Sequence, residues 1–433
     1  MSTPLRIGVV GVGYVGLTTA VCLARDHDVV AVDIDEAKMA KLRAGIAIID
    51  EAGLPALLAR MLDSGRLAFS TDYRALADRD VVFVCVSTPS GTDGAADLRA
   101  LDAATAGLAG VLRPGAVVTV KSTVPVGTTR RLAERLRPHG IGVVSSPEFL
   151  REGRAIADFT HPDRVVVGAE SGADAARVCA AYGADPATVL HMSPESAELA
   201  KYASNAFLAV KLSYTNSLAQ LCHSYGADVG DVTACMGADA RIGASFLQPG
   251  PGWGGSCLPK DTAALVHSAL ARGVAVAEVE AARRTNAAQP TRILAALQQS
   301  MPCPLEGSRI TVLGLTFKAA TSDTRDSPAL AVSAQLAAAG AHVDGYDPQL
   351  LAIEPAVLTA AGVTGVDDPY RAAKSADAIV VLTEWPQFRD LDWVAIAEQA
   401  PGAVVVDTRN LLHPAAVAAA GLRYLGNGYP DGF

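Results

Sequence analysis

Residues 5–16 read LRIGVVGVGYVG, and this stretch predicts the fold of the first part of the chain. A short run of apolar, mostly β-branched residues ends at three glycines with the spacing GxGxxG. A helical pattern then runs to Ala24 and is followed by a second apolar run, residues 29–32, and by Asp33. A strand, a glycine turn, a helix, a strand and then a carboxylate about 20 residues after the first glycine are typical of a dinucleotide-binding βαβ unit.

Each residue of this fingerprint has a separate expected role. Gly11 allows the tight turn, Gly13 lets a pyrophosphate approach the backbone, and Gly16 lets helix and strand pack closely. Asp33 is expected to accept hydrogen bonds from ribose hydroxyls and to repel a 2′-phosphate, which favours NAD over NADP. The alternative is a dinucleotide fold that has lost its ligand.

Three further apolar runs continue the pattern, at residues 81–86, 116–121 and 141–145. Strands buried on both faces of a parallel sheet are apolar over their whole length in this way. Ligands of such sheets bind beyond the carboxyl ends of the strands, where polar residues follow each run here. We therefore expect a cleft lined by four candidates, each with a turn or helix-capping role as the alternative: Thr88, Thr123, Glu148 and Glu152.

The middle of the chain loses the strand pattern. Residues 195–225 predict one long helix, on which Lys201 and Asn205 share a face because they are four residues apart. Leu208 and Leu212 continue roughly along that face, so both polar side chains are expected to point inward. A buried lysine needs a ligand or a paired anion, whereas a solvated surface lysine is the alternative. The many Ala, Ser and Asn residues favour close helix packing and a homodimer or higher oligomer.

The opening pattern returns near the end of the chain. Residues 309–314, 377–382 and 402–405 echo residues 6–11, 80–85 and 115–118, but no GxGxxG follows Gly314. We therefore predict an α/β protein with two Rossmann-like doubly wound domains, residues 1–194 and 301–433. A central helical domain, residues 195–300, joins them. Three cations after strand ends of the last domain fit a diphosphate, with plain surface charge as the alternative: Lys318, Arg325 and Arg409.

Composition limits the class of protein. The 433 residues correspond to about three domains of about 150 residues each, and a net charge of −9 disfavours nucleic acid or an acidic membrane as partner. The seven scattered cysteines include no CxxC pair, so we expect reduced thiols in the cytoplasm and no metal site. The chain enters a strand almost at once and has no apolar run of about 18 residues, so we expect neither a signal peptide nor a membrane span.

Residues 246–262, FLQPGPGWGGSCLPKDT, place Cys257 in a glycine- and proline-rich loop. Such a segment cannot form a regular helix or central strand, and its glycines would let a substrate carbon approach the sulfur. Lys260, three residues on, would favour the thiolate, which is the nucleophilic form. For a lone cysteine the usual alternative is a buried structural role.

A nucleophilic cysteine together with NAD suggests oxidation beyond the aldehyde. A thiolate adds to the aldehyde, a hydride then leaves, and water cleaves the resulting thioester. Lys201 and Asn205 could stabilise the oxyanion, while Glu148 or Asp261 could manage water and protons.

These residues resemble the UDP-glucose/GDP-mannose dehydrogenase family over nearly the whole chain. The resemblance rests on eight motifs in family order: GVGYVG, VSTP, KSTVPVGT, SPEFLREG, ELAKYASNAFLAVKLS, RIGASFLQPGPGWGGSCLPKD, GLTFKAATSDTRDSP and DTRN. It implies oxidation of UDP-glucose by two NAD to UDP-glucuronate.

The resemblance also implies residue roles. Cys257 is the implied nucleophile, Lys201 and Asn205 its oxyanion partners, and Asp261 the residue that activates water. Thr123 and Glu148 are implied to hold the water that takes protons in the first oxidation. For NAD the resemblance implies Tyr14, Val15, Asp33, Lys38, Thr88, Thr123, Glu152 and Arg325. For the sugar nucleotide it implies Glu148, Phe149, Leu150, Arg151, Glu152, Lys201, Asn205, Phe246, Leu247, Gln248, Pro249, Gly250, Gly254, Lys260, Lys318, Arg409 and, across a dimer interface, Arg241.

Alternatives remain within and beyond this family. Trp253 and Leu258 stand where UDP-glucose enzymes often have Phe, and GGSCLPKD also fits GDP-mannose dehydrogenases. A GDP-mannose 6-dehydrogenase, or a relative acting on another UDP-sugar, is therefore the first alternative. A two-electron hydroxy-acid dehydrogenase and a non-catalytic NAD-binding regulator are the others, and neither needs the cysteine loop.

Overall fold

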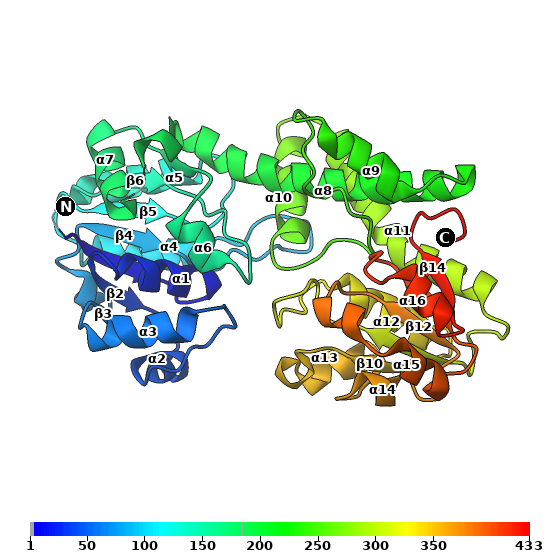
Figure 1. The fold of residues 1–433 in the computed structure, drawn as a ribbon. Coiled ribbons are helices and arrows are strands. Elements are labelled where there is room, and N and C mark those ends of the chain that lie inside the picture. Colours follow the sequence, from blue (N-terminus) through cyan, green and yellow to red (C-terminus); the bar gives the residue numbers. More distant parts are fainter. Residues whose placement is uncertain (1–3, 184) are drawn as a thin grey trace. The chain divides into compact units, whose positions relative to one another are not determined.

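The computed structural model describes residues 4–183 and 185–433, and the chain divides into two compact units (Figure 1). Unit 1 comprises Met1–Ser204 and Ala263–Val274, and unit 2 comprises Asn205–Thr262 and Ala275–Phe433. The boundary therefore passes through two helices, α8 (Pro194–Tyr225) and α10 (Leu258–Leu270).

Unit 1 is built on an eight-stranded sheet with the order β3-β2-β1-β4-β5-β6-β7-β8. All neighbours are parallel except β6 and β7. The strands are β1 (Arg6–Val10), β2 (Asp28–Val32), β3 (Leu67–Ser70), β4 (Val81–Val84), β5 (Val117–Val120), β6 (Gly142–Ser145), β7 (Val165–Gly168) and β8 (Val189–Met192). The first six strands in this order are those of a dinucleotide-binding fold.

Helices cover both faces of this sheet, because neighbouring strand residues enter different cores. Val9 packs in one apolar cluster with Leu17 of α1, while Val10 packs in another with Leu101 of α4. This alternation explains why the strands are apolar throughout. The helices of this part are α1 (Tyr14–Leu23), α2 (Glu36–Arg43), α3 (Leu54–Asp63), α4 (Arg99–Ala109), α5 (Thr128–Leu136), α6 (Ala155–Thr160) and α7 (Gly172–Tyr182), with short 3-10 turns at Tyr73–Leu76, Arg137–His139 and Pro186–Thr188.

Unit 2 contains a six-stranded, all-parallel sheet with the order β11-β10-β9-β12-β13-β14. Its strands are β9 (Arg309–Leu313), β10 (His342–Tyr346), β11 (Val363–Gly365), β12 (Ala378–Val381), β13 (Val404–Asp407) and β14 (Arg423–Gly426). Its smaller helices are α12 (Pro328–Ala338), α13 (Pro355–Ala360), α14 (Pro369–Ala372), α15 (Trp393–Gln399) and α16 (Pro414–Ala419), with 3-10 turns at Leu350–Ala352 and Pro386–Asp390. This order repeats the first six strands of unit 1, which confirms the predicted pair of doubly wound domains.

The middle of the chain is helical, as predicted. Residues 193–308, all of which the structure describes, contain no strand. The long helix α8 begins one residue before the predicted start and ends at Tyr225, where Gly226 takes a left-handed φ of 69°. The other helices here are α9 (Val229–Ala238), α10 and α11 (Ala277–Ser300). Among the described residues, no helix is long and apolar enough to cross a membrane.

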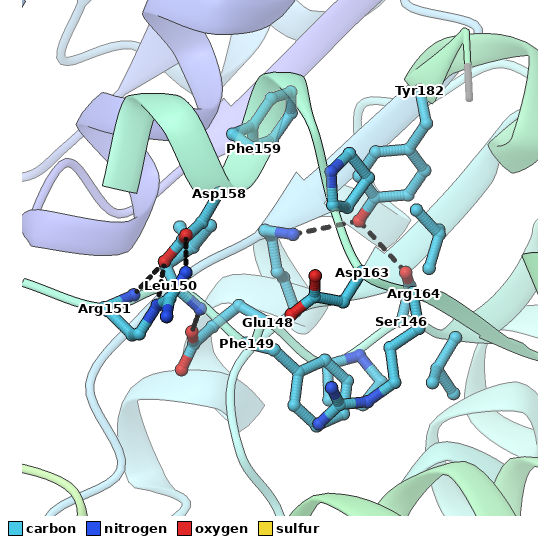
Figure 2. A pocket seen from close by; sticks show the side chains of 15 residues that line it. Ser146, Glu148, Phe149, Leu150, Arg151, Asp158, Phe159, Asp163, Arg164 and Tyr182 are labelled. Atoms are coloured by element: carbon cyan, nitrogen blue, oxygen red, sulfur yellow. Dashed lines mark hydrogen bonds and ion pairs between the residues drawn. The ribbon is translucent and has the colours of Figure 1, made fainter. Parts of the chain in front are cut away.

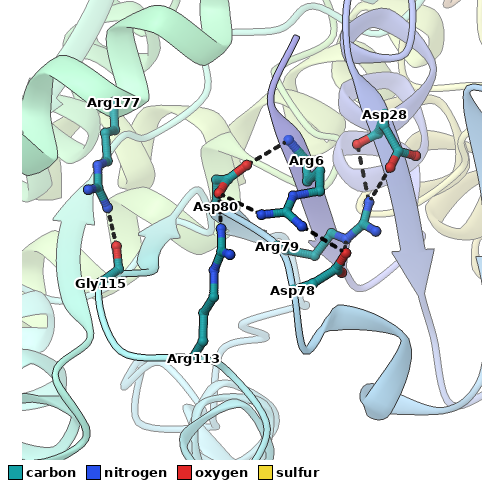
Figure 3. Close-up of polar contacts among 8 residues, drawn as sticks. All are labelled: Arg6, Asp28, Asp78, Arg79, Asp80, Arg113, Gly115 and Arg177. Atoms are coloured by element: carbon teal, nitrogen blue, oxygen red, sulfur yellow. Dashed lines mark hydrogen bonds and ion pairs between the residues drawn. The ribbon is translucent and has the colours of Figure 1, made fainter. Parts of the chain in front are cut away.

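Charged side chains tie the amino ends of the unit 1 strands together (Figure 3). The buried Arg79, just before β4, pairs with Asp28 at the start of β2 at 2.9 Å. Asp80 accepts a hydrogen bond of 2.9 Å from the Arg6 backbone at the start of β1 and also pairs with Arg113. These ion pairs stabilise the sheet at the amino ends of its strands. The candidate site residues follow the carboxyl ends of the same strands.

Candidate active site

The glycine turn after β1 has the geometry predicted for a dinucleotide site. Gly11 has a φ of 87°, and a Cβ on Gly16 would overlap the Gly11 carbonyl oxygen, so helix and strand pack closely only without side chains there. A Cβ on Gly13, in contrast, would meet nothing within 4 Å. That open backbone faces the N-terminus of α1, where a pyrophosphate binds in this fold.

Asp33, at the end of β2, is an ionised acceptor. Its carboxylate receives the backbone N–H of Val12 (2.7 Å) and of Asp35 (3.1 Å), and the ammonium of Lys38 at 3.1 Å. Burial alone would raise the pKa of Asp33, but these donors outweigh it and hold the pKa below its ordinary value. A carboxylate has about four acceptor sites, so one remains for a ribose hydroxyl. The residues present therefore fit NAD.

Tyr14, in the glycine turn, is connected to the loop that follows β6. Its hydroxyl donates to Glu51, and the Gly153 backbone N–H donates to both Tyr14 Oη (3.0 Å) and Glu51 Oε2 (2.9 Å). Burial, reinforced by Glu51, raises the pKa of Tyr14, so the phenol stays a donor. Sequence reasoning missed Glu51, because a single acid in an irregular loop carries no pattern.

The ends of β4 and β5 meet as predicted. The Thr88 hydroxyl donates to the Thr123 carbonyl oxygen at 2.8 Å, and both residues are buried. The buried Glu198 of α8 then accepts the backbone N–H groups of Gly127 and Thr129, each at 2.6 Å, at the start of α5. Glu198 thus fixes the loop that carries Thr123, a role the sequence did not indicate.

Lys201 points inward and its anion is Glu148. The two side chains are 4% and 8% exposed, and Lys201 Nζ lies 3.0 Å from Glu148 Oε1. Burial alone would raise the pKa of Glu148, but Lys201 and the Leu150 backbone N–H keep it below its ordinary value. The inward face of α8 was only partly predicted: it continues through Ala209 and Ser213, whereas Leu208 and Leu212 are half-buried.

The loop after β6 lines a pocket in unit 1 (Figure 2). The centroid of the Phe149 ring lies 3.9 Å from the Arg164 guanidinium and 5.1 Å from Lys201 Nζ. Arg151 is held by Asp158 through a pair of charged hydrogen bonds. The predicted residues Glu148, Phe149, Leu150 and Arg151 all line this pocket.

The pocket lining includes a buried lysine that sequence reasoning missed. Lys121 Nζ donates to the Tyr182 hydroxyl at 2.9 Å, which lies 3.0 Å from Ser146 Oγ (Figure 2). Burial alone would lower the pKa of Lys121, but Tyr182, Cys85 and Glu148 raise it above its ordinary value. A second cation therefore faces the Glu148 carboxylate.

In unit 2, Cys257 stands immediately before α10. The Asp261 backbone N–H donates to the Cys257 carbonyl oxygen at 2.8 Å, which makes this residue the start of the helix. The positive end of a helix favours a thiolate there. Asp261 is fully buried, accepts a 2.6 Å hydrogen bond from the Asn205 amide and pairs with Lys260. Four predicted residues are therefore brought together in this unit.

Two of the glycines before Cys257 have close neighbours within the protein. A Cβ on Gly254 would overlap the Asp326 carbonyl oxygen, and one on Gly255 would lie 2.7 Å from the Phe317 ring. The close packing of the protein thus requires small residues at both positions, and access of a substrate carbon stays a prediction. These glycines let the loop lie against the segment after β9.

Arg409, after β13, lies beside the loop that precedes Cys257. Its Nε donates to the Leu382 carbonyl oxygen at 3.0 Å and pairs with Glu384 at 3.2 Å. A Cβ on Gly250 would be 2.9 Å from Arg409 Nη1, so the predicted 246–250 segment and this cation are neighbours. Lys318 Nζ lies 5.5 Å from the centroid of the adjacent Phe317 ring.

Three further predicted residues, Arg325, Arg241 and Phe246, lie in unit 2. Arg325, the one NAD candidate that lies in unit 2, pairs with Asp323 at 2.6 Å. Arg241 pairs with Asp239 at 2.6 Å on an exposed turn. Phe246 has a φ of 64° and begins the segment that includes the buried Leu247. A positive φ at a bulky residue is strained and is maintained only by its surroundings.

In the second doubly wound sheet, the acid at the position that corresponds to Asp33 is enclosed by the protein. Asp347 ends β10 as Asp33 ends β2, and each accepts the backbone N–H that follows the first strand, here Leu315 at 2.7 Å. Asp347 Oδ2 also accepts from Thr316 (N and Oγ1, both 3.1 Å) and from Trp385 Nε1 at 3.2 Å. The carboxylate is 1% exposed, so it serves the fold of unit 2 and not a nucleotide ribose.

The glycine turn and Asp33 of unit 1 define a dinucleotide-binding protein. Residues 5–184, 195–288 and 311–414 match the NAD binding, central and UDP binding domains of the UDP-glucose/GDP-mannose dehydrogenase family. The chain belongs to this family, and NAD is its cofactor.

Relatives match the chain over its whole length. UDP-glucose 6-dehydrogenases of Rhizobium meliloti and Pseudomonas aeruginosa are 44% and 40% identical, covering 99% and 98% of this chain and 100% and 98% of their own. The structure of a UDP-glucose dehydrogenase from Pyrobaculum islandicum is 37% identical, with a TM-score of 0.90 and coverage of 99% of this chain and 98% of that one.

Proposed function

We propose that the chain oxidises UDP-glucose at C6 to UDP-glucuronate with two NAD. The observation that carries this proposal is full-length similarity at 40–44% identity to enzymes of that name, with Cys257 at the start of α10. No specific observation favours GDP-mannose as the substrate. The reaction of a two-electron hydroxy-acid dehydrogenase would not use the Cys257 thiol.

Bound NAD supplies the hydride acceptor for each of the two oxidations. The first oxidation removes a hydride from C6 and a proton from its hydroxyl, which leaves an aldehyde. The Cys257 thiolate then adds to that carbon, and the former carbonyl oxygen takes a proton. Loss of the second hydride and of that proton gives a thioester, and water cleaves the C–S bond to release carboxylate and thiolate.

The roles of the side chains follow from their charges and contacts. Lys201 is a cation, and Asn205 has a second amide N–H beyond the one it gives to Asp261, so both are proposed to stabilise the oxyanion. The ionised Glu148, with Thr123, is proposed to hold the water that receives the first proton. Asp261 is proposed to orient the water that cleaves the thioester.

The nucleotide sugar is tested by comparing substrates. With NAD and saturating sugar nucleotide, we expect UDP-glucose to give NADH, and GDP-mannose and simple 2-hydroxy acids to give little. Selectivity is measured as kcat/KM for each compound. NADH formation from GDP-mannose and none from UDP-glucose would contradict the proposal.

We also propose that the chain forms a homodimer through α8. Phe207, Tyr214, Leu221 and Tyr225 recur every seven or four residues, so they form one stripe on the helix. They are 50–81% exposed, which is unusual for a line of large apolar side chains. A second copy of the same helix would cover this stripe.

Replacing the centre of that stripe is expected to separate the subunits. Phe207→Glu with Tyr214→Glu places two charges in the proposed contact, and desolvating each costs several kcal/mol. Light scattering after size-exclusion chromatography is expected to report a monomer. Gln220→Glu, exposed on another face of the same helix, is the control and is expected to stay dimeric. A dimeric double variant would contradict the assignment of this interface.

We also propose a division of the chain into three domains, on the basis of the three family matches. They are an NAD-binding domain (residues 1–194), a central domain (195–300) and a UDP-sugar domain (301–433). A cytoplasmic location remains a prediction from the scattered cysteines.

A further inference from the structure

Asn286, on α11, holds the loop before Cys257 by its backbone. Its Oδ1 accepts the Trp253 N–H at 2.7 Å, and its Nδ2 donates to the Trp253 carbonyl oxygen at 2.9 Å. The Asn286 side chain thus satisfies both backbone polar groups of Trp253, as a neighbouring strand does for a residue in a sheet. Gly252 has a φ of 126°, and a Cβ there would lie 2.7 Å from Asn286 Oδ1, so the loop is fitted to this side chain.

Arg283, three residues earlier on the same helix, holds the chain after Cys257. Its Nη1 donates to the Pro259 carbonyl oxygen at 3.0 Å and to Thr262 Oγ1 at 2.7 Å. Both acceptors lie in the first turns of α10, and Thr262 is fully buried. Residues three apart on a helix lie on one face, so a single face of α11 contacts both sides of the thiol.

We propose that Arg283 and Asn286 are positioning residues that hold Cys257 where its thiolate captures the aldehyde. This inference rests on the proposed four-electron reaction. The first oxidation makes no use of sulfur, whereas the second begins only after the C–S bond has formed. A displacement of about 1 Å at a reacting atom can cost about 100-fold in rate, so loss of either anchor should slow the second oxidation selectively.

The test separates the two oxidations in the full-length protein. In Asn286→Ala and Arg283→Ala, rapid-quench single turnovers with UDP-glucose are expected to show the second hydride transfer slowed about 10- to 100-fold. The first hydride transfer is expected to keep most of its rate. Aldehyde should then escape, where a carbonyl reagent traps it, and the yield should fall below two NADH per sugar.

Neighbouring side chains provide matched controls. Arg284→Ala removes the adjacent arginine, which is 71% exposed and has only a 3.9 Å contact with Glu280, and Gln298→Ala removes an exposed amide from the same helix. Both are expected to behave as wild type. Asn286→Asp keeps the acceptor for the Trp253 N–H, and Arg283→Lys keeps a cationic donor, so each is expected to recover part of the second oxidation.

A purely structural role predicts a different result. Fewer folded molecules would lower the amplitudes of both hydride transfers equally and leave both rate constants unchanged, with no aldehyde trapped and the yield still at two, and that result would overturn the proposal. So would wild-type kinetics in both alanine variants. Amide exchange of residues 250–256, which needs no turnover, is expected to speed up in Asn286→Ala, and unchanged exchange would also overturn it. A wild-type protein that forms no NADH from UDP-glucose would instead refute the proposed function.

Discussion

Cys257→Ala is expected to abolish conversion of UDP-glucose to UDP-glucuronate while NAD still binds. Without the thiol no thioester forms, and loss of a catalytic nucleophile costs about a thousandfold in kcat or more. The glycine turn and Asp33 lie in unit 1, whereas Cys257 lies in unit 2, so the dissociation constant for NAD should stay near the wild-type value. The rate of UDP-glucuronate formation and NAD titration by calorimetry measure the two effects.

The chain offers a matched control for this variant. Cys235 is a free, exposed cysteine on α9, also in unit 2, and Cys235→Ala is expected to retain full activity. Normal turnover in Cys257→Ala would end the assignment of Cys257 as nucleophile. Lost NAD binding would indicate a wider structural effect.

Lys201→Met is expected to cause the second large loss, in both turnover and stability. Removing an oxyanion donor typically costs about 100- to 1,000-fold in kcat. Removing one partner of a buried ion pair costs about 3–5 kcal/mol, because Glu148 would remain charged and buried. Thermal or urea unfolding measures the stability, and Lys41→Met, at an exposed lysine of unit 1, is the control.

The pH dependence of that loss provides a sharper test. The pair holds the pKa of Glu148 below its ordinary value of 4.5. Its stabilisation in the wild type is therefore present above that value and is lost as pH falls through the folded-state pKa. In Lys201→Met burial would raise the pKa instead, although Lys121 still opposes it. The variant should regain stability relative to wild type between pH 8 and about pH 5. A stability difference that does not change with pH would contradict this account of Glu148.

Much of the fold followed from residue patterns. The apolar runs located β1, β2, β4, β5, β9, β12 and β13 to within about two residues, because strands buried on both faces must be apolar throughout. The echo between the two ends of the chain predicted the second sheet, whose strand order matches. The long helix followed from its uninterrupted helical pattern and from Gly226.

The predicted site was less complete, for physical reasons. Lys201 could be placed inward from helical spacing, but its partner Glu148 is 53 residues away, and no local pattern joins them. Glu51, Lys121 and Glu198 act through contacts that only the tertiary fold creates. Asp347 is the opposite case, a residue at the strand end where the sequence pattern would place a ribose acceptor. Its carboxylate accepts hydrogen bonds from Thr316 and Trp385 instead, so it stabilises the fold.

The central claim is a four-electron oxidation through Cys257, and the yield of NADH per sugar tests it most directly. With limiting UDP-glucose and excess NAD, the reaction run to completion is expected to give two NADH for each UDP-glucose consumed. UDP-glucuronate is expected as the product. A yield of one NADH, with an aldehyde or ketone as the product, would contradict the account.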